Sequence, residues 1–316
     1  MSKKRKKSLE KNEQRPIDPL ETKREEVNGQ VALEYQKGGE FREGIDALQA
    51  EYSRRQTIAL PFLEKTLGSK PGVEYFIAPP VMTRTDFDYY GDMDVVIIAP
   101  EGADTDFDSP EGLFIMPQSI TREDLQEKME KYPEVHDWFE KKLGEVPTSE
   151  KNVSAPEEIT AAAPTAQNFN EDAVESKIRY GLSPETRANI REYRLLIADV
   201  FMADVQKRFP AMNWHVSGST VENLKKFSIC SDLDIDMLFD APIKEEQNEI
   251  FWYLHNYLKP LYREKYKLKI DTHDDYLTEL ERFAQLDPKF KPFYEEKYGI
   301  KLDDDGVNDG EDNQGE

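Results

Sequence analysis

The sequence is poor in several residue types that particular kinds of site require. Of its 316 residues only Cys230 is a cysteine, which excludes an intramolecular disulfide and a zinc site built on paired cysteines. The four histidines lack metal-ligand spacing. No apolar run approaches the roughly 20 residues that cross a bilayer, and no apolar segment follows the basic start of the chain. We therefore expect a soluble, intracellular protein, cytoplasmic or nuclear, with no membrane partner.

Positive charge is outnumbered by negative charge. There are 42 Lys and Arg against 64 Asp and Glu, which gives a formal net charge of −22. A large nonspecific nucleic-acid surface is not expected, because affinity for polyanions rests on Lys and Arg contacts to phosphates. The basic run from Lys3 to Lys7 is open to three interpretations: a nuclear address, a nucleic-acid-binding arm or a solubilising tail.

Composition divides the chain into five segments. Hydrophobic residues make up 38% and aromatic residues 11%, which predicts a real core despite 34% charged residues. Charge-rich composition predicts disordered tails over residues 1–40 and 301–316. Three prolines in a Ser-, Thr-, Ala- and Glu-rich stretch predict a linker over residues 146–175. Two α/β units remain, at 41–145 and 176–300.

The two units follow the same order of patterns, in which a helix precedes a strand and then an acidic strand. The segments Asp92 to Pro100 and Asp234 to Pro242 both begin Asp-x-Asp, continue with apolar residues and end in Ala-Pro. This order predicts a duplicated fold. The alternative is that two unrelated αβ units share common pieces by chance.

The first unit departs from the second where chemistry would matter. Ala78-Pro79-Pro80 stands where Gly218-Ser219-Thr220 would be expected. Because proline lacks an amide donor, we predict that the first unit is a degenerate copy without a phosphate loop. Its acids are expected mainly at a solvated strand edge, with cation binding as the alternative; they are Asp86, Asp88, Asp92 and Asp94.

Regular elements are predicted around the acidic strand of the second unit. Ser183-Pro184 marks a helix start, and apolar residues at helical spacing follow it. A second helix is supported by Ile250 to Leu261, with Pro260 expected to end or bend it. Short strands are predicted at Asn213 to Ser217 and Tyr266 to Asp271.

Three aspartates alternate in the acidic strand of the second unit. Asp232, Asp234 and Asp236 would project from one side of an extended strand. Carboxylates that close raise one another's pKa and cost stability unless a cation neutralises them, which predicts a divalent metal. Upstream, Gly218 permits close backbone approach, and the neighbouring amides and the Ser219 hydroxyl could hold phosphate oxygens.

These residues resemble the DNA polymerase β-like nucleotidyltransferase superfamily, whose motif is Gly-Ser, a gap of about ten residues, and Asp-x-Asp. The run from Gly218 to Lys225 also resembles that of Mab-21 domains, relatives of cyclic GMP-AMP synthases, although Asn223 replaces a glycine there. The resemblance implies an α+β fold with a mixed sheet flanked by helices of nucleotidyltransferase type, covering residues from about Pro184 to Tyr276.

The resemblance also implies a chemistry. Mg²⁺ or Mn²⁺ would support transfer of a nucleoside monophosphate from a nucleoside triphosphate to a nucleotide, an RNA end or a protein hydroxyl. The metal ligands would come from Asp232, Asp234, Asp236 and Asp271, with Asp271 as the third carboxylate from a neighbouring strand. The Mab-21 register selects Asp234 and Asp236, whereas the commoner Ser-Asp-x-Asp register selects Asp232 and Asp234. Gly218, Ser219 and Lys225 would bind the triphosphate.

Other interpretations of the same residues stay open. The acids could be a charged strand edge that blocks unwanted pairing, and Gly218-Ser219 an ordinary turn. Lys226 and Arg263 could meet the triphosphate or simply be solvated. Because only about 40 residues follow Asp271, we do not expect a large substrate-gripping helical domain after it, unless the N-terminal unit takes that role. The alternative function is therefore a catalytically inactive interaction or scaffold protein that keeps the fold.

Overall fold

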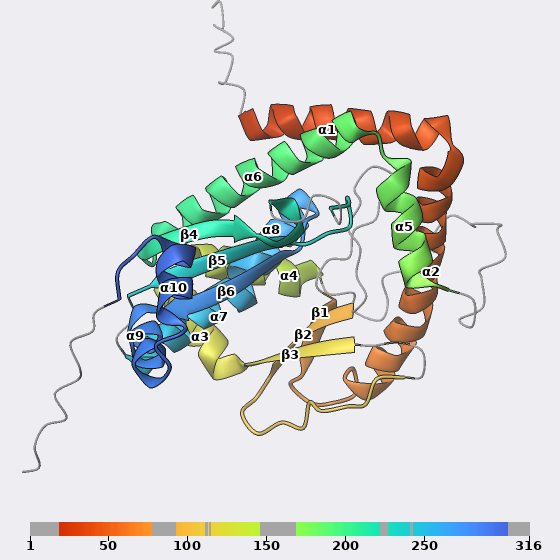
Figure 1. The fold of residues 1–316 in the computed structure, drawn as a ribbon. Coiled ribbons are helices and arrows are strands. Elements are labelled where there is room, and N and C mark those ends of the chain that lie inside the picture. Colours follow the sequence, from red (N-terminus) through yellow and green to blue (C-terminus); the bar gives the residue numbers. More distant parts are fainter. Residues whose placement is uncertain are drawn as a thin grey trace, which may run out of the picture.

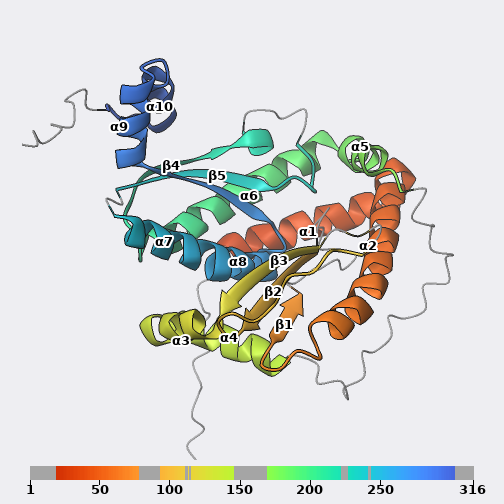
Figure 2. The same ribbon diagram turned by 90° about the horizontal axis from the view of Figure 1, so that it is seen from below.

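The chain folds as an α+β protein with two three-stranded mixed sheets (Figures 1 and 2). This confirms the mixed α+β class predicted from the sequence. The computed structural model describes residues 19–77, 93–110, 113, 115–145, 169–221, 227–240 and 243–302.

The two sheets share one strand order and one set of directions. In the first, β1 (Glu74–Ile77) pairs antiparallel with β2 (Met93–Ala99), and β3 (Ile115–Thr121) pairs parallel with β2. The second repeats this with β4, β5 and β6, where β5 is central. Its strands are Ala211–Ser217, Leu233–Phe239 and Ile270–Tyr276.

The parallel connections differ between the sheets. The described part of the chain between β2 and β3 contains no helix, whereas β5 and β6 are joined through α7 and α8. These two helices are Lys244–Tyr253 and Lys259–Tyr266. The π-helical segment Leu254–Leu258 joins them just before Pro260, which lacks an N–H for a regular helical hydrogen bond. Pro260 therefore changes the winding of the helix without ending it.

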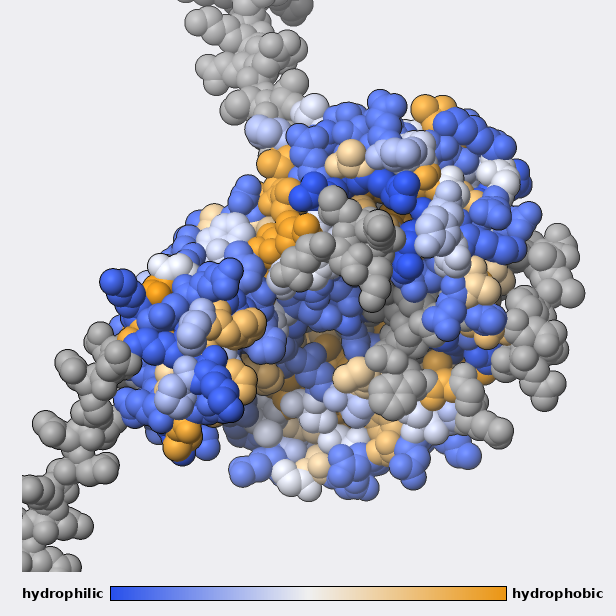
Figure 3. All heavy atoms as spheres, viewed as in Figure 1, coloured by the Kyte–Doolittle hydropathy of each residue, from blue (hydrophilic) through white to orange (hydrophobic). Residues whose placement is uncertain are grey.

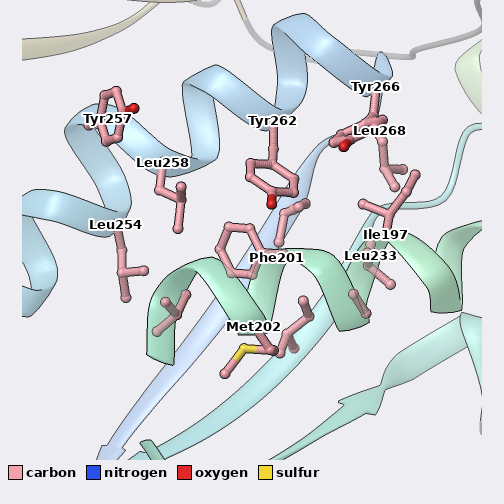
Figure 4. Close-up of a cluster of buried hydrophobic side chains, with 14 of the residues drawn as sticks. Ile197, Phe201, Met202, Leu233, Leu254, Tyr257, Leu258, Tyr262, Tyr266 and Leu268 are labelled. Carbon is pink, nitrogen blue, oxygen red and sulfur yellow. The ribbon is translucent and has the colours of Figure 1, made fainter. Parts of the chain in front are cut away.

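Helix α6 (Pro184–Gln206) and the α7–α8 helix cover one face of the second sheet. The predicted start of α6 is confirmed, since the Ser183 side chain caps it by accepting from Thr186 N at 3.2 Å. In Figure 4, Phe201 of α6 faces Tyr262 of α8, and their ring centroids lie 5.1 Å apart. The inward side chains of β5, such as Leu233, complete this layer (Figure 4).

The N-terminal region is more ordered than its composition predicts. Residues Pro19–Lys37 form helix α1, so the predicted disorder of residues 1–40 is wrong for this part; residues 1–18 lie outside the described residues. Helix α1 lies along α6 (Figure 1), burying Val27 and Val31, and Lys23 Nζ lies 2.6 Å from Glu192 Oε2. A few buried residues at helical spacing suffice to dock the helix, although the average composition is highly charged.

Helix α5 (Glu171–Gly181) occupies the end of the predicted linker and packs along α2 (Gly39–Thr66). Asn170 caps α5 by accepting from Ala173 N at 3.0 Å, and Ile178 is fully buried. The linker prediction is therefore wrong for residues 171–175, where a cap and an apolar side chain outweigh the polar composition. Residues 146–168 lie outside the described residues.

The two sheets are held together by a shared interior. One apolar cluster includes Val96 of β2 and Ile235 of β5, and the helices α3 (Arg122–Lys131) and α4 (Pro133–Glu145) meet α7 and α8. At this interface Tyr132 Oη donates to Glu249 Oε1 at 2.6 Å, and Trp138 Nε1 donates to Glu264 Oε2 at 3.2 Å. The two predicted units thus pack as parts of one core.

Helices α9 (Leu277–Leu286) and α10 (Lys291–Tyr298) cover part of the other face of the second sheet. Leu238 of β5 joins Leu280, Tyr298 and Leu302 in a small separate apolar cluster. This packing lies toward the Phe239 end of β5 and so leaves the opposite end uncovered by α9 and α10. Residues 303–316 lie outside the described residues, and none of the described helices is both long and apolar enough to cross a membrane.

Candidate functional site

The turn that follows β4 places backbone directly against a carboxylate of β5. Strand β4 ends at Ser217, which pairs with Asp234, and the chain then turns at Gly218 with φ +66°. A Cβ at Gly218 would overlap Asp234 Oδ2 and lie 2.9 Å from Asp234 Cγ. Two separate constraints, the left-handed backbone and this close approach, therefore require glycine at position 218.

The rest of the turn is held from α6. Residues Gly218–Thr220 form a short 3₁₀ turn in which Ser219 is half-buried and Thr220 is fully buried. Arg191 Nε of α6 donates to the Thr220 carbonyl at 2.6 Å. The predicted phosphate loop is thus a fixed turn beside Asp234. Lys225, the third predicted triphosphate ligand, lies outside the described residues, as does Lys226.

Asp271 lies directly across from Asp234, as the sequence predicts. The two residues are partners in the parallel pairing of β5 and β6, so their side chains leave the same face of the sheet. Burial raises the pKa of Asp234 above its ordinary value, and the charges of Asp271 and Asp236 raise it further. A cation between these carboxylates would relieve that repulsion.

Asp232 precedes β5 and shares a lysine with Asp271. Lys269 Nζ lies 3.2 Å from Asp232 Oδ2 and 3.1 Å from Asp271 Oδ2. Burial raises the pKa of Asp232 to about 6, against the opposing charge of Lys269. Burial would also raise the pKa of Asp271, but Lys269 and Lys259 outweigh it and hold that pKa below its usual value. The ammonium group therefore neutralises most directly the carboxylate of β6.

Asp236 belongs to a different network on the same face. Its carboxylate lies 3.2 Å from His215 Nε2 of β4 and 3.1 Å from Lys297 Nζ of α10. Lys297 also lies 3.0 Å from Asp275 Oδ2, which accepts from Tyr298 Oη at 2.5 Å. Asp236 is 8% exposed. Asp236 thus has its own partners in β4 and α10, although its charge still acts on Asp234.

The four predicted carboxylates do not gather into one ready-made metal site. Throughout the described ranges, no three His, Cys, Asp or Glu side chains are arranged to hold a metal ion together. Of the two registers, Asp232 with Asp234 is the one whose side chains lie near Asp271. The Asp236 carboxylate instead contacts His215 of β4 and Lys297 of α10.

Two lysines that lie close to the carboxylates were not predicted from the sequence to be part of the site. Lys269 stands two residues before Asp271, and alternation in an extended segment places such residues on the same side. Lys259 is half-buried at the start of α8, with Nζ 3.9 Å from Asp271 Oδ1 and 3.5 Å from His255 Nδ1. Its burial lowers its pKa. Only the spacing of Lys269 could have been used as a signal; the approach of Lys259 depends on how α8 packs.

The first sheet uses its acidic residue differently. Asp94 of β2 is paired across the parallel ladder with Met116 of β3, so a facing carboxylate is absent there. The Asp94 carboxylate instead forms an ion pair with Nη1 of Arg263 from α8. Arg263 is therefore engaged with the first sheet, which contradicts the interpretation that it is simply solvated. Asp86, Asp88 and Asp92 lie outside the described residues.

The molecular surface is hollowed between the second sheet and the first sheet (Figure 3).

Comparison of the chain with protein-family models, with curated proteins and with solved structures found no match.

Proposed function

We propose that the chain is a metal-dependent nucleotidyltransferase. It transfers a nucleoside monophosphate from a nucleoside triphosphate to a hydroxyl group of a nucleotide, an RNA end or a protein. The observation that carries this proposal is the placement of Asp271 directly across from Asp234, whose carboxylate in turn lies against the Gly218 turn.

The donor atoms are of the kind that Mg²⁺ or Mn²⁺ prefers. Asp232, Asp234 and Asp271 offer only oxygen ligands, which hard divalent cations prefer. The raised pKa values of Asp232 and Asp234 reflect first their burial and then the nearby charge of Asp271, both of which disfavour the charged carboxylates. When bound, such ions activate an acceptor hydroxyl and neutralise triphosphate charge.

The residues of the chain have distinct tasks in this proposal. Asp234 and Asp271 hold the cation from adjacent strands, and Asp232 supplies a further oxygen ligand. The backbone of the Gly218–Ser219 turn approaches the phosphates, and Gly218 keeps that turn against Asp234. Asp236 fixes His215 and Lys297 and does not bind metal. A net charge of −22 favours a small acceptor or a partner protein over a long nucleic acid.

The test is nucleotide incorporation with each labelled nucleoside triphosphate, in Mg²⁺ and in Mn²⁺. We expect Asp234→Ala to abolish incorporation, because it removes the central ligand. The matched control is Asp240→Ala, which removes an exposed carboxylate just beyond the other end of β5. Equal incorporation by the wild type and Asp234→Ala would reject the assignment.

A second candidate function is an interaction protein that keeps this fold without catalysis. It is favoured by one observation: the Lys269 ammonium already lies between Asp232 and Asp271. Calorimetry with nucleoside triphosphates and Mg²⁺ separates the two functions. Tight, metal-dependent binding supports the transferase, whereas absence of binding for every nucleotide supports the interaction protein.

A further inference from the structure

Lys269 is placed as a cation bridge between two carboxylates from different segments. Its Nζ atom is nearly equidistant from Asp232 Oδ2, at 3.2 Å, and Asp271 Oδ2, at 3.1 Å. Both distances are those of an ion pair. The ammonium group thus occupies the space where the two acids face each other.

The backbone around Lys269 is well anchored while its side chain stays accessible. Leu268 and Ile270 on either side are buried, and the Leu233 N–H donates to the Lys269 carbonyl at 3.0 Å. The Lys269 side chain is 37% exposed. Rotation of this side chain can therefore carry the ammonium group into solvent without moving the strand.

The other lysines on this face have different positions. Lys259 Nζ is 3.9 Å from Asp271 Oδ1, on the side of the carboxylate that faces α8. Lys297 bridges Asp236 and Asp275 in the same way as Lys269 bridges its two aspartates, but the Lys297 side chain is only 14% exposed. Among the described lysines, Lys269 is the one that joins Asp232 to Asp271.

We propose that Lys269 is a resident counter-cation that competes with the divalent ion for the space between Asp232 and Asp271. The ion enters only when the ammonium group leaves, so Lys269 sets the metal concentration at which the site becomes loaded. This inference rests on the proposed function for the presence of a divalent ion. It adds the regulation of that site by a side chain of the chain itself.

The experiment measures Mn²⁺ binding to the full chain by electron paramagnetic resonance, with folding checked by circular dichroism. We expect Lys269→Met to bind Mn²⁺ at least tenfold more tightly than the wild type, because the competing charge is gone. Lys269→Arg keeps the charge and should stay within about threefold of the wild type. Adding Asp271→Asn to Lys269→Met should remove the gain, which assigns it to this site rather than to other acids.

The matched control is Lys297→Met, which removes a lysine that bridges two aspartates elsewhere on the same face. It should leave Mn²⁺ affinity within about threefold of the wild type. The proposal is overturned if Lys269→Met binds Mn²⁺ no more tightly than the wild type, or if neither protein binds it.

A second measurement uses the wild type and avoids any folding defect of a variant. Acetylation of lysines with limiting reagent, followed by mass spectrometry, reports whether each ammonium group is accessible. Saturating Mn²⁺ should increase the acetylation of Lys269 and leave that of Lys297 unchanged. If Lys269 acetylation does not change, the competition does not occur.

The two proposals fail differently. If the Lys269 effects are seen without any nucleotide incorporation, the counter-cation proposal stands and the transferase proposal fails. Incorporation that depends on Asp234, with no effect of Lys269→Met on Mn²⁺ affinity, overturns the counter-cation and keeps the transferase.

Discussion

Replacing Gly218 by alanine tests the contact on which the candidate site depends. Gly218 has φ +66°, and its missing Cβ would overlap Asp234 Oδ2. The left-handed backbone alone costs an alanine about 1 kcal/mol. Rotation of the Asp234 side chain away from the new methyl group adds about 1 kcal/mol. We therefore expect Gly218→Ala to lower the free energy of unfolding by about 2 kcal/mol.

The chain provides a matched control for the backbone term. Gly299, after α10, has φ +63°, but a Cβ there would have only Asn213 Nδ2 near it, at 4.0 Å. Gly299→Ala should therefore lose about 1 kcal/mol, from the backbone alone. The difference between the two variants isolates the contact between position 218 and Asp234.

Urea denaturation measures both stabilities, and nucleotide incorporation measures the consequence for the site. Displacing a ligand carboxylate by about 1 Å can cost a catalyst on the order of a hundredfold in rate. Gly218→Ala should show a loss of that size, and Gly299→Ala should retain activity. Equal stabilities of the two variants, together with full activity of Gly218→Ala, would refute the reasoning.

Two further predictions concern the ion pairs between the two sheets and their helices. Asp94→Asn should destabilise the protein by about 2 kcal/mol in urea, because the buried Arg263 guanidinium loses the charge of Asp94. Arg122→Gln, which breaks an exposed pair with Glu74, should cost less than about 1 kcal/mol. Equal losses would mean that burial does not strengthen the Asp94 pair. Burial raises the pKa of Glu249, but the lysine and tyrosine partners of its carboxylate outweigh burial and hold that pKa below the ordinary 4.5. The ionised Glu249 therefore stabilises the fold above pH 4.5, and this stabilisation is lost as the pH falls through the folded-state pKa. The stability advantage of the wild type over Glu249→Gln, measured in urea, should therefore be complete at pH 7 and shrink below pH 4.5, and an advantage independent of pH would contradict this.

The parts of the site that were predictable from sequence are those fixed by local patterns. Alternation along a strand gives the faces of Asp234 and Asp271, and a glycine before Ser219 marks a turn that other residues do not enter easily. A strand that carries Asp271 followed from the order of the elements, but its predicted bounds of Tyr266 to Asp271 were wrong, because α8 continues to Tyr266 and β6 spans Ile270–Tyr276. These features need only the periodicity of the strand and the connection between neighbouring segments.

The parts that were missed depend on contacts between distant segments. Lys297 reaches Asp236 from α10, 61 residues away in the sequence, so no local pattern links them. Helix α1 was hidden because a few apolar residues in a charged stretch hardly change its composition, although they suffice to dock it on α6. The average composition of a segment gives its overall polarity, whereas docking of a helix depends on whether its few apolar residues lie on one face.

The two sheets use acids on their central strands in complementary ways. Asp234 faces another carboxylate and lies next to a glycine turn, which suits it to hold a cation. Asp94 faces Met116 and pairs with Arg263, one helical turn after Lys259 on α8. The first sheet therefore anchors the helix whose first residue approaches Asp271. Asp94, which faces no carboxylate, thus helps to hold α8 in place beside Asp271. This gives a physical reason for the two sheets to share one core.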